Sequence, residues 1–310
     1  MIEFFLPREA RAPLVLEVLD SSGALVRRFR SDEAPEPGAE ELARELIPQY
    51  WIRLPQALPA RGGMHRWVWD LHYTAPVSAT HGYPISAVPH ATPRQPQGPL
   101  ATPGNYRVRL SFDGQRLEAP LTLKPDPRVT AGPEALAQQL QVATRLAGLL
   151  TQSSQALLAA RSENAQLKAL APSGAALEAA RAYETRLTEL LRSKAEQEKA
   201  AAGTEEARPP AGAPAAPQAS EPAEARVNLK DLQEEISGLY TEVTRADAAP
   251  TAVQRAATDG AQTKLTGLLA KWQQLQADLP ELNKRLQAAK LTPIRTDLAP
   301  PRDANIADEE

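Results

Sequence analysis

The segment Asn105–Leu123, NYRVRLSFDGQRLEAPLTL, indicates most directly how the first part of the chain folds. Its first half alternates between apolar and polar residues, which is the period of a strand with one buried face. The apolar positions that share this face are Tyr106, Val108, Leu110 and Phe112. Asp113-Gly114 is a typical two-residue hairpin turn. The segment therefore predicts two antiparallel strands joined by a tight turn.

Similar patterns lie on the N-terminal side of this hairpin. Leu14–Leu19 and Leu25–Phe29 flank a turn that contains Gly23, which predicts a second hairpin. Met1–Leu6 predicts a further strand, and so does Met64–Tyr73, in which every second residue from His65 to Tyr73 shares one face. Six or seven short antiparallel strands within residues 1–128 favour a β-sandwich of immunoglobulin-like type.

Two proline-rich insertions interrupt the predicted sandwich, at residues 31–62 and 74–104. The first contains a predicted short helix at Gly38–Leu46. The second is long for a loop inside a compact domain, and such loops either carry function or dock against a surface. Pro125-Asp126-Pro127 then ends the last strand, because proline cannot donate a hydrogen bond to a β-ladder.

The chain beyond residue 132 is predicted to be helical. Its composition is rich in Ala, Leu, Gln, Glu and Arg, and strands followed by helices indicate separate β and α modules. We predict a helical hairpin at residues 133–202, opened by Pro133 and broken at Pro172-Ser173-Gly174 with Ser173 as helix cap. The Ala/Pro-rich residues 203–225 predict a disordered linker, because they contain no large apolar side chain.

A second helical hairpin is predicted at residues 226–290, followed by a frayed tail at 291–310. Its last helix carries apolar residues at alternating spacings of four and three, which is typical of a coiled-coil or helical-bundle seam. The seam residues are Ala261, Leu265, Leu268, Trp272, Leu275, Leu279, Leu282 and Leu286. Pro280 is expected to kink or restart this helix, with Asp278 as its cap. We expect the two hairpins to pack together as a bundle of about four helices.

Composition excludes several classes of function. The 310 residues contain no cysteine, so disulfides and cysteine-based catalysis or metal binding are excluded. The net charge is −3, with basic residues spread evenly, which is unlike a nucleic-acid-binding protein. No apolar run is long enough for a transmembrane helix. The N-terminus lacks the basic region and apolar run of a signal peptide.

No residue pattern predicts a catalytic, cofactor or metal site. His72, His81 and His90 are nine residues apart beside the proline-rich insertion, and nothing in this spacing brings three ligands together. A role in loop packing is therefore expected for them. The adjacent carboxylates Glu40-Glu41 and Glu234-Glu235 point in different directions on a helix, which favours solvent-facing positions.

The aromatic residues allow two interpretations. The face that holds His65, Trp67, Trp69 and Tyr73 resembles the inner face of a sandwich, but flat exposed aromatics also form carbohydrate-stacking platforms. We therefore retain five residues as a possible ligand platform: Tyr50, Trp51, Trp67, Trp69 and Tyr73. Tyr50 and Trp51 lie on an irregular segment and are expected to be more exposed than the strand tryptophans.

Several motifs together resemble one family over nearly the whole chain. They include YWIR at residues 50–53, GMHRWVWDLHY at 63–73, HGYPISA at 81–87 and PGNYRVRL at 103–110. Further matching segments are GPL at 98–100, DPRV at 126–129, ADAAPT at 246–251 and LPELN at 279–283. In combination they resemble the C-terminal region of bacterial glycosyl-hydrolase-like proteins with BNR or sortilin-like repeats.

In that family a β-propeller precedes this region and carries the ligand or catalytic chemistry, so the enzyme label transfers to none of these residues. The resemblance implies a non-catalytic accessory or interaction region of a secreted or periplasmic protein, with a propeller as its partner. A carbohydrate-binding module is the alternative. If a propeller is the partner, we expect an exposed apolar patch around Met1–Leu6 and the 74–104 insertion.

Overall fold

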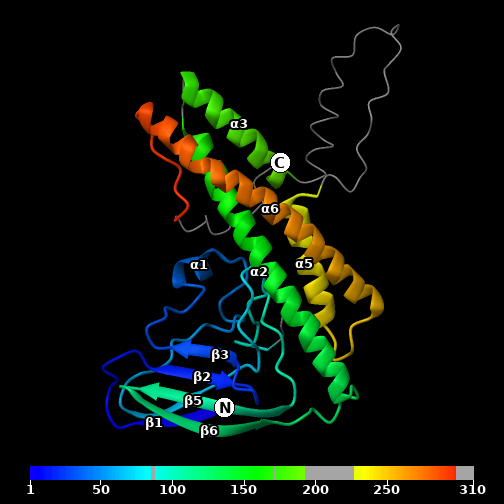
Figure 1. The fold of residues 1–310 in the computed structure, drawn as a ribbon. Coiled ribbons are helices and arrows are strands. Elements are labelled where there is room, and N and C mark those ends of the chain that lie inside the picture. The colour runs from blue at the N-terminus through cyan, green and yellow to red at the C-terminus, as the bar shows by residue number, and fades with distance from the viewer. Residues whose placement is uncertain (85–87, 171, 173, 193–226, 298–310) are drawn as a thin grey trace. The chain divides into compact units, whose positions relative to one another are not determined.

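A β region is followed by a helical region, as the sequence predicts. The computed structural model describes residues 1–84, 88–170, 172, 174–192 and 227–297 (Figure 1). The strands are β1 (Ile2–Leu6), β2 (Val15–Leu19), β3 (Leu25–Arg30), β4 (Gly63–Trp67), β5 (Gly104–Phe112) and β6 (Gln115–Leu123). The helices are α1 (Ala39–Arg44), α2 (Pro133–Ala169), α3 (Gly174–Leu191), α5 (Leu229–Thr244) and α6 (Ala252–Ala288).

The strands form two small antiparallel sheets. One contains β1 and β4. The other has the strand order β3-β2-β5-β6 (Figure 1). Both predicted hairpins are present, with β2 paired to β3 and β5 paired to β6. Apolar side chains from both sheets share one cluster, which includes Phe4 and Trp67 from the first sheet and Leu16, Val108 and Leu110 from the second.

The predicted strand at Met64–Tyr73 is shorter than expected. Strand β4 ends at Trp67, and Leu71 has a left-handed backbone with φ of 65°. A strand cannot pass through that conformation, so the two-residue alternation stops there. Trp69 is buried and Leu71 is exposed, although the alternation places them on one face.

The described residues form two compact units. The first comprises Met1–Pro76, Thr80–Gly148 and Tyr240–Ala252, and the second comprises the other described residues. The first unit thus contains both sheets, the start of α2 and the end of α5. The remaining lengths of α2, α5 and α6, together with α3, belong to the second unit.

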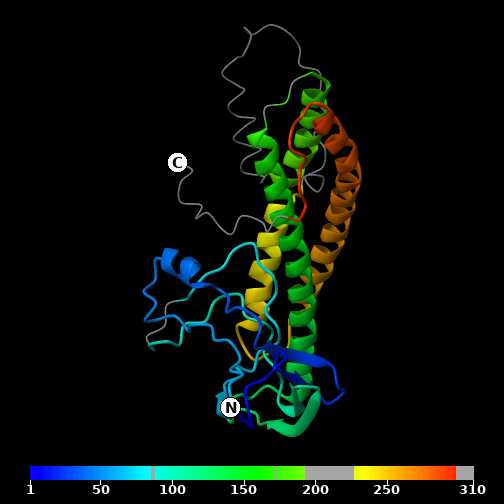
Figure 2. The same cartoon turned by 90° about the vertical axis from the view of Figure 1, so that its left-hand side faces the viewer.

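Within the second unit, helices from before and after residues 193–226 contact one another, and in both views they run side by side (Figures 1 and 2). Lys264 on α6 bonds to Glu235 on α5 at 2.9 Å, and Arg186 on α3 pairs with Asp278 on α6. Seven of the eight predicted seam residues are buried: Ala261, Leu265, Leu268, Leu275, Leu279, Leu282 and Leu286. Trp272 is only half-buried.

Helix α6 does not restart at Pro280. It is continuous from Ala252 to Ala288 with Pro280 inside it. Asp278 pairs with Arg186 of α3 instead of capping a new helix. Apolar contacts on both sides of the proline, at Leu279 and Leu282, bury this part of the helix and offset the missing backbone donor.

The tail is ordered further than predicted. Ile294 is buried, and its backbone N–H and C=O bond to the Asn283 amide at 2.7 and 3.0 Å. The Arg295 backbone bonds in the same paired way to the Gln166 amide, at 2.8 and 2.9 Å. Two amides thus hold residues 291–297, which we call the tail strap. Ser173, the whole predicted linker at residues 203–225 and residues 298–310 lie outside the described residues.

Candidate functional site

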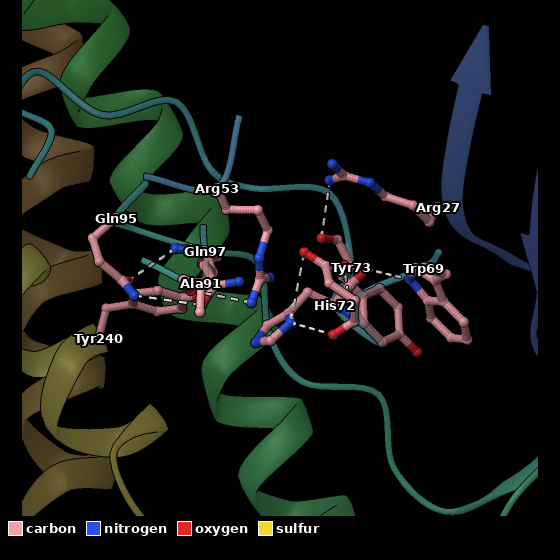
Figure 3. A network of polar contacts seen from close by, with 10 residues as sticks. Arg27, Arg53, Trp69, His72, Tyr73, Ala91, Gln95, Gln97 and Tyr240 are labelled. Carbon is pink, nitrogen blue, oxygen red and sulfur yellow. Dashed lines mark hydrogen bonds and ion pairs between the residues drawn. The ribbon is translucent and has the colours of Figure 1, made fainter. Parts of the chain in front are cut away.

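The irregular chain after β4 is held by side chains that bond to backbone groups (Figure 3). The Trp69 indole N–H donates to the His72 carbonyl at 2.9 Å, and His72 Nδ1 donates to the Asp70 carbonyl at 2.8 Å. Arg27, from β3, donates to the Tyr73 carbonyl at 3.2 Å. These bonds satisfy buried polar groups where no strand ladder is available.

A glycine allows two irregular segments to lie side by side. A Cβ atom at Gly98 would lie 2.1 Å from the Tyr73 carbonyl oxygen, so no other residue fits there. On either side of this close approach, Tyr73 N–H donates to the Pro99 carbonyl at 2.9 Å, and Ala101 N–H donates to the Leu71 carbonyl at 2.7 Å. The second proline-rich insertion therefore lies against the chain that follows β4.

Helix α5 anchors the same insertion at Gln97. The hydroxyl of Tyr240 donates to the Gln97 carbonyl at 2.7 Å (Figure 3). Burial raises the pKa of Tyr240 well above its usual range, so this hydroxyl stays a donor at neutral pH. Gln95 exchanges backbone hydrogen bonds with Gly82 at 2.8 and 3.3 Å. These hydrogen bonds therefore hold the second proline-rich insertion in place within the first unit.

Of the three candidate histidines, His81 and His90 lie in this insertion and His72 lies just before it. His72 and His81 bond to nearby carbonyl groups, at Asp70 and Gln95, which agrees with the expected role in loop packing. His90 contacts the ring of Tyr50, with ring centroids 5.3 Å apart. Within the described part of the chain, no three His, Cys, Asp or Glu side chains are grouped so as to hold a metal ion.

The structure divides the five candidate aromatic residues into two groups. Trp67 and Trp69 are only 7% and 4% exposed, which favours the inner-face interpretation over a ligand platform for these two residues. Tyr73 packs beside the cluster that contains Trp69, and burial raises its pKa to about 12. These three side chains therefore pack in the interior of the first unit or at its margin.

Tyr50 and Trp51 form the second group. Tyr50 is 56% exposed, and its ring centroid lies 5.1 Å from that of Trp51 and 5.3 Å from that of His90. The backbone of His90, with φ of 57°, donates to the Tyr50 carbonyl at 2.9 Å. We call Tyr50, Trp51 and His90 the aromatic group. The sequence does not predict that His90 contacts Tyr50, because forty positions separate them and no motif links them.

The sheet of β1 and β4 exposes a largely apolar surface. Phe5 and Met64 are cross-strand partners, and the exposed pair Glu3 and Arg66 lies next to them with an ion pair of 2.8 Å. Met1, just before β1, and Val68, just after β4, are also exposed. Met1, Phe5, Met64 and Val68 are between 63% and 71% exposed, and we call them the outer β1–β4 face. The expected exposure of apolar residues in Met1–Leu6 is thus confirmed for Met1 and Phe5.

In the part of the chain that the structure describes, no helix is both long and apolar enough to span a membrane. Comparison with family models, with curated proteins and with solved structures finds no match for this chain.

Proposed function

We propose that this chain is a non-catalytic interaction region that binds a propeller-type partner through the outer β1–β4 face. The resemblance to secreted glycosyl-hydrolase-like propeller proteins supports the identity of the partner. In this proposal the catalytic or ligand chemistry belongs to the propeller, and the present chain supplies a docking surface. The observation that carries the proposal is the exposure of four large apolar side chains, two on the sheet of β1 and β4 and two directly beside its strands.

Two features favour an immunoglobulin-like sandwich as the scaffold of this surface. Trp67 is buried in the cluster shared by the two sheets, as a tryptophan is in immunoglobulin domains. The Tyr106 hydroxyl donates to the Thr102 carbonyl at 2.7 Å, which resembles the tyrosine corner of such sandwiches. The contacts among α2, α3, α5 and α6 in the second unit similarly favour a helical bundle.

The outer β1–β4 face is suited to binding because it places apolar side chains beside a charged pair. Phe5 and Met64 adjoin the Glu3–Arg66 ion pair, so apolar contacts and a charged pair are available side by side. Contiguous apolar side chains of this kind commonly mark a protein interface. Covering them removes apolar area from water, which favours a complex, and the gain has to exceed the entropy that the two partners lose on association.

The test is a double substitution, Phe5→Ser with Met64→Ser, which leaves the buried residues of β1 and β4 unchanged. The matched control is Leu117→Ser on β6, because Leu117 is as exposed as Phe5 but lies on the other sheet. Binding to a β-propeller encoded beside this chain is measured by isothermal titration calorimetry. We expect the double variant to weaken binding by at least about tenfold, and the control to bind as the wild type does.

Equal binding by the double variant and the wild type would contradict the assignment of the outer β1–β4 face as the binding surface. Absence of binding to any propeller encoded beside this chain would contradict the proposal that a propeller is the partner.

The aromatic group supports carbohydrate binding as a second candidate function. An exposed Tyr50 beside Trp51 offers ring faces on which a sugar can stack. Affinity electrophoresis in gels that contain soluble polysaccharides tests this function. We expect Tyr50→Ala with Trp51→Ala to abolish any retardation, whereas Trp272→Ala, a half-buried tryptophan of the second unit, should not. Unretarded wild-type protein on every polysaccharide would contradict this second function.

A further inference from the structure

Glu163 is a buried carboxylate in the second unit. It lies on α2 and is only 1% exposed. The Tyr183 hydroxyl, from α3, donates to Glu163 Oε2 at 2.7 Å. The Gln276 side-chain amide, from α6, lies 2.8 and 3.0 Å from the two carboxylate oxygens. Three helices therefore meet at this group.

The charge of Glu163 is not balanced by the described residues. No Lys, Arg or His side chain among them forms an ion pair with it, and burial raises its pKa above the usual value. Arg186 pairs with Asp278, and Arg295 pairs with Asp297 at 2.7 Å, so both neighbouring guanidinium groups already have partners. The bonds from Tyr183 and Gln276 favour the ionised form, but they bring no positive charge.

A cavity of about 270 Å³ adjoins this carboxylate. Its walls combine Glu163 and Ser162 with the apolar side chains of Val77 and Leu158, and Arg295 of the tail strap also lines it. This volume is slightly below that of typical drug-sized pockets, so it suits a molecule of a few non-hydrogen atoms. The cavity thus combines an acceptor with an apolar surface.

The hydrogen-bonding capacity of the carboxylate leaves room for a ligand. An ionised carboxylate offers about four acceptor positions. The Tyr183 hydroxyl and the shared Gln276 amide account for three contacts with Glu163. The Ser162 hydroxyl receives only a long contact of 3.4 Å from Gln166, so it can also accept a hydrogen bond. A ligand that carries several N–H donors and a positive charge matches this surface.

We propose that the cavity binds a small organic ammonium ion, whose N–H groups donate to Glu163 and whose short apolar body lies against Val77 and Leu158. The ion supplies the positive charge that the described residues do not provide. The tail strap forms one wall, and the paired amide bonds from Gln166 and Asn283 hold that wall in place without a ligand. This site is separate from the docking function proposed above and does not depend on it.

The test uses the full chain and n-butylammonium chloride as the probe, with n-butanol as a neutral molecule of nearly the same shape. Binding is measured at slightly alkaline pH by ligand-observed NMR and by the shift in melting temperature relative to sodium chloride. We expect n-butylammonium to bind and to raise the melting temperature, and n-butanol to bind at least about tenfold more weakly.

Three variants locate the binding. Glu163→Gln is expected to weaken n-butylammonium binding by at least about tenfold, because it removes the negative charge. Glu235→Gln, at a half-exposed glutamate paired with Lys264, is the matched control and should bind like the wild type. Ala159→Leu fills the cavity without changing the carboxylate, and it should also abolish binding. Circular dichroism establishes that each variant is folded.

Three results would overturn the proposal. The first is no detectable binding of n-butylammonium to the wild type. The second is equal binding of n-butanol, which would show an apolar cavity without charge recognition. The third is wild-type affinity in either folded variant, Glu163→Gln or Ala159→Leu. Weaker binding at acidic pH supports the proposal, because protonation of Glu163 removes its charge.

Discussion

At the residue scale, Trp69 shows how a side chain outside any strand can belong to the core. It follows β4, where the chain has left the sheet, yet it is almost completely buried. Its ring meets that of Tyr106 in an edge-on arrangement with centroids 5.9 Å apart. Its indole N–H is satisfied by the His72 carbonyl. Burial of the ring and a satisfied donor together favour this position.

Trp69→Ala is therefore expected to lower the free energy of unfolding by about 3–5 kcal/mol, the range for removing a buried large aromatic side chain. Tyr50→Ala provides the control, because Tyr50 is mostly exposed and its loss should cost about 0.5 kcal/mol or less. Chemical denaturation of both variants measures the difference. An unchanged midpoint for Trp69→Ala would contradict its role in the core.

The alternation of apolar and polar residues predicts which side chains are buried where the chain forms a regular strand. Tyr106 and Val108 are buried as their alternation on β5 indicates. The aromatic group could not be predicted completely, because His90 reaches Tyr50 through a left-handed backbone in an irregular segment. The sequence does not predict the burial of Glu163 either, because a glutamate in a helical sequence is usually exposed. Its partners Tyr183 and Gln276 lie on other helices.

At the scale of elements, the hairpins and helices follow from local signals, but the contacts that end or extend them do not. Gly23 and Asp113-Gly114 mark the two hairpin turns in the sequence. The tail strap is different, because Gln166 and Arg295 are 129 positions apart. A side-chain amide that bonds to the backbone as a strand partner would leaves no periodic pattern in the sequence, so the sequence predicts a frayed tail instead.

Pro280 provides a test at this scale. Because α6 continues through it, the proline leaves the backbone carbonyl four residues earlier without its usual helical donor. Pro280→Ala restores that donor, and it should raise the free energy of unfolding by about 1–3 kcal/mol. Thermal and chemical denaturation measure the change.

The control is Asp278→Asn, which preserves the size of the side chain and its capacity to cap a helix. Asp278 pairs with Arg186 at the surface, so this variant should lose less than about 1 kcal/mol. A destabilised Pro280→Ala variant would contradict this prediction and would indicate that a bend at the proline is required for the packing of α6.

At the scale of the whole molecule, buried tyrosines are present in both compact units. Tyr73, Tyr83 and Tyr240 belong to the first unit, and Tyr183 belongs to the second. Burial raises the pKa of each hydroxyl, to about 12 for Tyr73. For Tyr183, the hydrogen bond to the Glu163 carboxylate raises the pKa further, because ionisation would place two negative charges together. The ionisation of tyrosine is therefore coupled to unfolding in each unit.

The direction of this coupling follows from the proton balance. An unfolded tyrosine has a pKa of about 10, whereas these native tyrosines keep their protons to higher pH. Between those values the native state binds more protons than the unfolded state, so stability falls as pH rises. We expect the melting temperature to decrease steadily above about pH 10, and the phenolate absorbance of the buried tyrosines to appear together with unfolding.

Tyr240→Phe distinguishes this mechanism from general alkaline repulsion. The variant loses the hydrogen bond to Gln97, which should cost about 1 kcal/mol at neutral pH. It also has one ionisable group fewer, so its stability should fall less steeply above about pH 10 than that of the wild type. Melting temperatures of both proteins across this alkaline range provide the comparison. Two results would contradict the coupling, because neither is compatible with hydroxyls that ionise only when the chain unfolds. One is a parallel fall of the two melting temperatures with pH. The other is full tyrosine ionisation near pH 10 without loss of near-ultraviolet circular dichroism.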